Sequence, residues 1–128
     1  MKPLTQEWVV KAEGDFATAT RELAIEEDPN YDAVCFHTQQ CAEKYLKACL
    51  QEEDSPFGKT HNLTDLLDQL LPFEPTWEVL RSELRGLTLY AVDYRYPGLF
   101  ADKVEASEAL TICQQVRDLA RGRLGLAS

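Results

Sequence analysis

The chain from about residue 31 to about residue 53 carries the side chains best suited to chemistry. At about 100° per residue in a helix, five polar residues there fall within roughly 80° of one another: His37, Gln40, Lys44, Lys47 and Gln51. Two cations and an imidazole on one helix face suit an anionic ligand such as a phosphate. The spacing therefore predicts a polar, ligand-facing stripe.

Two polar residues lie inside the apolar arc opposite this stripe, one helical turn apart. They are Gln39 and Glu43. A carboxylate on an apolar face must find a partner, because desolvating an unpaired charge is costly. Among the cations outside this helix we expect Lys59 or Arg95 to reach Glu43. Two interpretations follow, a site that positions a ligand or a buried polar network that fixes helix register.

The loop Lys59-Thr60-His61-Asn62-Leu63 precedes another apolar helical pattern. Thr60 or Asn62 can cap that helix, and free amides at its start could receive an anion. Lys59 and His61 beside it would suit a phosphate. Alternatively, His61 only pins the loop through a hydrogen bond.

A second corner of interest is Tyr94-Arg95-Tyr96-Pro97. Proline forces Tyr96 out of the helical region, so the chain turns there. Arg95 between two tyrosines could stack on a base or bind a phosphate, with Tyr96 beside it. The structural alternative is that the tyrosines pack against the protein and Arg95 caps a helix or pairs with an acid.

The sequence offers little for nucleophilic or metal catalysis. It lacks GxSxG, P-loop and HExxH motifs, and it has no CxxC. Neither His37 nor His61 has a partner at metal-ligand spacing. The four cysteines fit small buried thiols in a reducing compartment. We therefore expect no catalytic residue, no metal and no cofactor.

Five segments with apolar residues at steps of three and four would position these groups. The first runs from Thr5, as N-cap, to about Glu27, and the second from about residue 31 to about residue 53. The third covers about residues 63–71, the fourth carries Trp77 to Ala91, and the fifth covers about residues 102–123. Short loops join them, which predicts a single all-α domain over residues 1–128, an antiparallel up-and-down bundle of about five helices.

The charge and hydropathy of the sequence exclude some classes of binding partner. Thirteen Lys and Arg against 22 Asp and Glu give a net charge of −9 over 128 residues. A surface this acidic disfavours duplex DNA, whose binding requires many phosphate-neutralising cations, but a local basic stripe can still bind a nucleotide or a short RNA. Without a long apolar run or a signal pattern, we expect a soluble cytoplasmic protein with no membrane contact.

Three motifs, in order, resemble those of HEPN domains. The run from Phe36 to Ala48 (FHTQQCAEKYLKA) resembles the family's FHxQQAxEKxLKA helix. Lys59-Thr60-His61-Asn62-Leu63 resembles KTHxL, and Arg95-Tyr96-Pro97 resembles RYP. Trp8 and the Lys11-Ala12-Glu13-x-Asp15 stretch resemble the family's first helix. The resemblance implies a bundle of four or five helices, usually dimeric, found beside minimal nucleotidyltransferases in toxin–antitoxin-like pairs or acting as a metal-independent ribonuclease.

The ribonuclease branch of HEPN proteins carries Arg, four to six residues, then His. No histidine follows an arginine at that spacing here, and the segment Arg85-Gly86-Leu87-Thr88-Leu89-Tyr90 has tyrosine where the histidine would stand. Tyrosine is a poor general base at neutral pH. The resemblance therefore does not imply ribonuclease activity, and we expect no enzyme.

The leading hypothesis is a non-catalytic HEPN module that binds a nucleotide or a similar ligand, as a homodimer or beside a minimal nucleotidyltransferase. Lys44, Lys47 and Lys59 would neutralise phosphate, Arg95 and Tyr96 would hold the base or a second phosphate, and Gln39 and Glu43 would orient the cations. A pure interaction or dimerisation module without a ligand is the alternative. A third is a divergent ribonuclease that uses His37 or His61.

Overall fold

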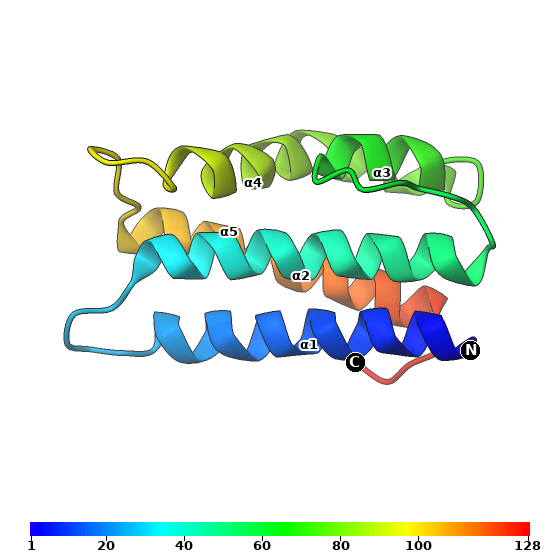
Figure 1. Cartoon of the computed structure of the whole chain (residues 1–128), viewed down its shortest axis with the longest axis horizontal. Coiled ribbons are helices and arrows are strands. Elements are labelled where there is room, and N and C mark those ends of the chain that lie inside the picture. The colour runs from blue at the N-terminus through cyan, green and yellow to red at the C-terminus, as the bar shows by residue number, and fades with distance from the viewer.

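The computed structural model describes all 128 residues, and each of its regular elements is helical. In chain order they are α1 (Pro3–Leu23), α2 (Tyr31–Glu52), α3 (Leu63–Leu70), the 3-10 helix η1 (Pro75–Leu80), α4 (Arg81–Asp93) and α5 (Lys103–Arg123). Helix α2 runs between α1 on one side and the α3–α4 layer on the other, with α5 behind (Figure 1). The expected all-α, up-and-down bundle of about five helices is confirmed.

Helix α2 is the centre of the molecule because it contacts α1, α3, α4 and α5. Thirteen of its 22 residues are buried, so burial extends well beyond one apolar arc. The buried set includes four polar side chains, Thr38, Gln39, Glu43 and Lys47. Each of these needs a partner within the protein, since an unpaired buried polar group is destabilising.

The other helices turn the predicted apolar stripes inward. All four leucines of the α3 stripe are fully buried: Leu63, Leu66, Leu67 and Leu70. Trp77, Leu80, Leu84, Leu87 and Ala91 of η1 and α4 are likewise buried. Full burial of each leucine stabilises the fold by roughly 1.5–3 kcal/mol. These stripes fix which face of each helix is turned outward.

Some helix ends differ from the sequence prediction. Helix α1 begins at Pro3 after Lys2, and Thr5 is buried in its first turn instead of capping it. Proline suits the first helical position because its missing N–H would have no partner there. The helix ends at Leu23, four residues early, where the Glu22 carboxylate accepts a hydrogen bond from the Asn30 amide at 2.7 Å. The fourth segment begins as η1, and α4 proper starts at Arg81.

All four cysteines are free and buried, as expected for structural thiols. Burial raises the pKa of Cys35 and of Cys49 to about 12, so neither thiol ionises readily. No helix combines the length and apolarity that a membrane crossing requires.

Candidate functional site

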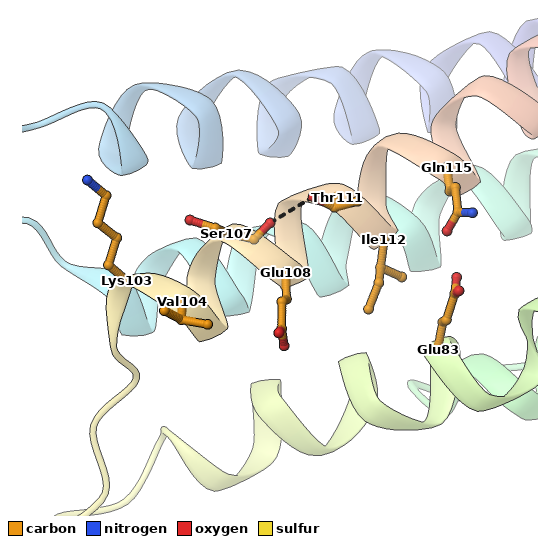
Figure 2. A pocket seen from close by; sticks show the side chains of 8 residues that line it. All are labelled: Glu83, Lys103, Val104, Ser107, Glu108, Thr111, Ile112 and Gln115. Atoms are coloured by element: carbon orange, nitrogen blue, oxygen red, sulfur yellow. Dashed lines mark hydrogen bonds between the residues drawn. The ribbon is translucent and has the colours of Figure 1, made fainter.

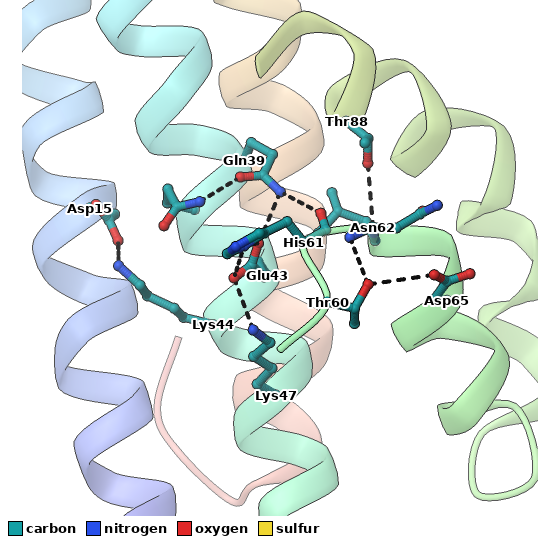
Figure 3. A network of polar contacts seen from close by, with 12 residues as sticks. Asp15, Gln39, Glu43, Lys44, Lys47, Thr60, His61, Asn62, Asp65 and Thr88 are labelled. Atoms are coloured by element: carbon teal, nitrogen blue, oxygen red, sulfur yellow. Dashed lines mark hydrogen bonds and ion pairs between the residues drawn. The ribbon is translucent and has the colours of Figure 1, made fainter. Parts of the chain in front are cut away.

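A buried polar network joins α2 to the loop before α3 (Figure 3). The Glu43 carboxylate accepts hydrogen bonds from Gln39 Nε2 at 3.2 Å and from Lys47 Nζ at 3.1 Å. His61 Nδ1 lies 3.0 and 3.2 Å from the two Glu43 oxygens. Gln39 Nε2 also donates to the His61 carbonyl oxygen at 3.0 Å. The network therefore fastens both the backbone and the ring of His61 to α2.

The prediction that Lys59 or Arg95 reaches Glu43 is wrong, because neither side chain contacts the Glu43 carboxylate. Lys47 is closer because residues four apart on a helix lie side by side. The second partner, His61, comes from the loop beside Lys59. Gln39 and Glu43 are each only 3% exposed, so they form a buried network, one of the two interpretations of the sequence.

Lys47 belongs to the predicted polar stripe but is 5% exposed. Its Nζ lies 5.5 Å from the ring centroid of Trp8 on α1 and 5.8 Å from that of Phe57. The two rings cover the ammonium and stabilise its charge, which Glu43 also neutralises. This enclosure leaves Lys47 no open side on which to meet a phosphate.

His37 and Lys44 both contact Asp15 on α1. His37 Nδ1 lies 2.8 Å from Asp15 Oδ1, and Lys44 Nζ donates to Asp15 Oδ2 at 2.6 Å. The Asp15 side chain is only 11% exposed. Sequence reasoning missed Asp15 as a partner, although an acid on the antiparallel helix facing the stripe was the available signal. The positive charges of the polar stripe are therefore largely neutralised by carboxylates of the protein itself.

A small pocket opens between α2, the loop before α3 and the C-terminal half of α4. Its volume is about 260 Å³, and its lining comprises Phe36, Gln39, Gln40, His61, Thr88, Ala91, Val92 and Arg95. It brings together three predicted site residues that are distant in sequence, Gln40, His61 and Arg95. Phe36, Thr88 and Val92 were not predicted, and only the α2–α4 packing reveals them.

Three of the polar residues that line this pocket keep binding capacity, namely Arg95, His61 and Gln40. Arg95 forms no side-chain hydrogen bond or ion pair within the protein. His61 uses Nδ1 on Glu43, so its Nε2 stays free, and its side chain is 76% exposed. Gln40 Nε2 donates to Gln39 Oε1 at 2.8 Å, which leaves the side-chain oxygen of Gln40, Oε1, free. The pocket thus offers one unpaired cation beside two polar groups held by the buried network.

The start of α3 is less open to an anion than the sequence suggested. Of the two candidate caps, Thr60 and Asn62, Asn62 caps the helix, with Oδ1 accepting from the Thr64 amide at 3.0 Å. The Asn62 amide donates to Thr60 Oγ1 at 3.1 Å, and the Leu63 amide to Thr88 Oγ1 at 3.4 Å. These amides therefore already have acceptors.

Two other predicted site residues lie on the surface outside the pocket lining. Lys59 is exposed in its loop, and Tyr96 is 64% exposed after α4. Tyr94, by contrast, packs against the bundle and donates its hydroxyl to Glu105 on α5. Tyr94 therefore fits the structural interpretation of this corner. Tyr96 and Arg95 remain available to a ligand, as the binding interpretation requires.

Comparison with known proteins agrees with the fold. A family model described as the HEPN domain matches residues 5–123. The crystal structure of TT1696 from Thermus thermophilus superposes with a TM-score of 0.80 at 23% identity, covering 93% of this chain and 97% of that one. ST0689, an archaeal HEPN homologue, superposes with a TM-score of 0.72 at 23% identity, covering 95% and 98%. None of the curated protein sequences matches this chain significantly.

Proposed function

Because the chain belongs to the HEPN domain family, we propose that it is a non-catalytic module that binds a nucleotide, or the end of a short RNA, by its phosphate. The binding site is the pocket between α2, the loop before α3 and α4. The observation that carries this proposal is Arg95, an unpaired guanidinium that lines the pocket together with His61 and Gln40.

Each lining group has a distinct role. The Arg95 guanidinium donates two parallel hydrogen bonds to phosphate oxygens, a geometry to which its planar fork is suited. The free Nε2 of His61 and the free side-chain oxygen of Gln40 accept hydrogen bonds from sugar hydroxyls. Phe36 and Val92 supply an apolar wall. Lys44 and Lys47 stay paired with Asp15 and Glu43 and bind no phosphate.

The volume of the pocket limits what it encloses. At about 260 Å³ it is smaller than the roughly 300–1,000 Å³ typical of pockets that enclose a whole small molecule. It therefore encloses one moiety, the phosphate, and leaves the base outside. The exposed ring of Tyr96, next to Arg95 in the chain, offers the base a surface for stacking. Lys59, also exposed, provides a peripheral charge for a longer RNA.

The module acts as a homodimer or beside a minimal nucleotidyltransferase, in a cytoplasmic toxin–antitoxin-like pair. Support for this part of the proposal comes from the family membership and from the motifs in α2, in the loop before α3 and after α4. Sedimentation of the protein alone and with a candidate partner would distinguish the two assemblies.

A thermal-melting panel tests ligand binding. Mono-, di- and trinucleotides are added at millimolar concentration, with and without magnesium. A ligand at one hundred times its dissociation constant stabilises the native state by about 2.7 kcal/mol, which raises the melting temperature of a bundle of this size by several degrees.

The matched variants are Arg95→Glu and Arg85→Glu. Both arginines lack side-chain partners, but Arg85 lies on the exposed face of α4 and does not line the pocket. A shift lost in Arg95→Glu and retained in Arg85→Glu supports the site. A flat panel contradicts it and favours the pure interaction module.

One observation favours a second candidate, the divergent metal-independent ribonuclease. The buried Glu43 binds His61 through Nδ1 and leaves Nε2 without a partner, and His61 lines the same pocket as Arg95, an arrangement suited to general acid–base chemistry. RNA cleavage by the protein that His61→Ala abolishes would favour this candidate. Intact RNA, or cleavage that survives the substitution, would refute it.

A further inference from the structure

A longer groove runs along the other side of α4, between α4 and α5 (Figure 2). It has a volume of about 760 Å³ and shares no lining residue with the pocket described above. Its wall on α5 includes Val104 to Gln115, twelve residues that span eleven steps of 1.5 Å, or about 16 Å. That length accommodates about three turns of a helix.

The surface of the groove is mainly apolar. Ile112 on α5 points toward α4, Val104 is 65% exposed at one end, and Gln115 lies at the other end (Figure 2). An open apolar strip between two helices is the kind of surface on which the apolar face of a third helix packs.

Two carboxylates give the groove a negative charge. Glu83 on α4 points across it toward Ile112 and Gln115 (Figure 2). Its Oε2 is shielded from solvent and has no hydrogen-bond donor in the protein. Glu108 on α5 accepts only a 3.3 Å hydrogen bond from the Tyr90 hydroxyl. A shielded carboxylate oxygen without a donor is a vacant place for a cationic group.

We propose that the α4–α5 groove binds an amphipathic helical segment of a partner protein, in which a Lys or Arg is flanked by apolar residues. The apolar face of that segment covers Ile112 and Val104, and its cation supplies the missing donor to Glu83. The same carboxylates, in a protein of net charge −9, repel nucleic acid. In a second copy of this chain, arginines 117, 121 and 123 of α5 are already paired with acids of the same chain and would not supply this cation.

A peptide library tests this surface. Helical peptides of about three turns, displayed on phage, are selected on the full-length protein, and the enriched sequences are synthesised for fluorescence-anisotropy titration. We expect the enriched peptides to carry a Lys or Arg between apolar residues at positions i, i+3 or i+4 and i+7. Enrichment of peptides without a basic residue, or no enrichment, would overturn the proposal.

Variants locate the binding. Glu83→Lys should weaken the enriched peptides by about tenfold or more, because it places like charges together. Glu26→Lys, which makes the same charge change at an exposed position between α1 and α2, should alter affinity less than about twofold. Equal effects of the two substitutions, or a concentration-dependent dimer that Glu83→Lys dissociates, would overturn the proposal, the latter by showing that a second copy fills the groove.

Discussion

At the scale of single residues, Glu43 holds two parts of the protein together through one carboxylate. It accepts from Gln39 and Lys47 within α2 and pairs with His61 from the loop before α3. The same contacts that anchor the loop also orient His61, which lines the candidate pocket and whose other ring nitrogen has no partner in the protein. Stability and binding are therefore coupled at Glu43, and substitutions there must be interpreted with a stability measurement.

Replacing Glu43 by alanine should destabilise the protein by about 3–5 kcal/mol, because Lys47 would stay buried without its carboxylate. Urea denaturation followed by circular dichroism measures the change. The double variant Glu43→Leu with Lys47→Met removes both charges and should regain most of the loss. A single-variant loss below about 1 kcal/mol would contradict a structural role for this pair.

Lys44 should contribute to stability but not to ligand affinity. Its Nζ binds Asp15 on α1, and it does not line the pocket. We expect Lys44→Gln to leave nucleotide affinity within about twofold of the wild type, since only a remote charge is lost. Calorimetric titration checks this, and a tenfold loss would restore the original hypothesis of a cationic stripe as the binding surface.

At the scale of helices, a cluster around Glu13 joins α1 to α2 and α5. The Glu13 carboxylate accepts from Arg117 Nε at 2.8 Å and Nη2 at 2.9 Å, and from the Tyr45 hydroxyl. Arg121 in turn donates to that hydroxyl at 3.0 Å. The hydrogen bonds from Arg117, followed by the one from Tyr45, hold the pKa of Glu13 below its ordinary value of 4.5 despite partial burial.

This lowered pKa makes the contribution of Glu13 dependent on pH. The ionised carboxylate stabilises the fold fully above the unfolded-state value of 4.5, and the contribution is lost as pH falls through the lower folded-state pKa. The stability gap between the wild type and Glu13→Gln should thus be constant above about pH 5.5 and shrink in more acidic solution. Urea titrations across pH measure it, with exposed Glu26→Gln as the control; a gap that widens on acidification would contradict the assignment.

Replacement by alanine should change the stability of the protein in opposite directions at two glycines. Gly86 lies within α4, and a methyl group there meets no atom within 4 Å. Gly86→Ala should stabilise α4 by about 0.5–1 kcal/mol. Gly58, with φ of +64°, lies in a conformation that alanine adopts at a cost of about 1 kcal/mol. Denaturant midpoints of the two variants test the pair, and destabilisation by Gly86→Ala would show that this face of α4 is not open.

At the scale of the whole molecule, the central place of α2 explains what could be predicted from the sequence. The leucines of α3 and the stripe from Trp77 to Ala91 follow from helical period alone, because each of these helices buries one face. Helix α2 is covered on several sides, so a polar residue such as Lys47 can be enclosed although the wheel places it on a polar face. A wheel describes one helix and contains no information on how many neighbours cover it.

The candidate pocket likewise depends on contacts between helices, which a helical wheel does not describe. Gln40, His61 and Arg95 were each singled out by residue type and motif, but their meeting in one pocket depends on how α4 packs on α2. Asp15 and Thr88 were missed because their roles arise only from contacts between helices. Residue chemistry was therefore predictable from sequence, whereas the pairing of charges was not.

Calorimetric titration shows whether Arg95 binds the phosphate of a ligand in this pocket. The nucleotide that gives the largest thermal shift is titrated into the wild type, Arg95→Glu and Arg85→Glu. We expect Arg95→Glu to weaken binding by about tenfold or more, because charge-assisted hydrogen bonds worth about 1.5–3 kcal/mol are lost, and Arg85→Glu to bind like the wild type. Equal affinities in all three proteins would contradict this role of Arg95.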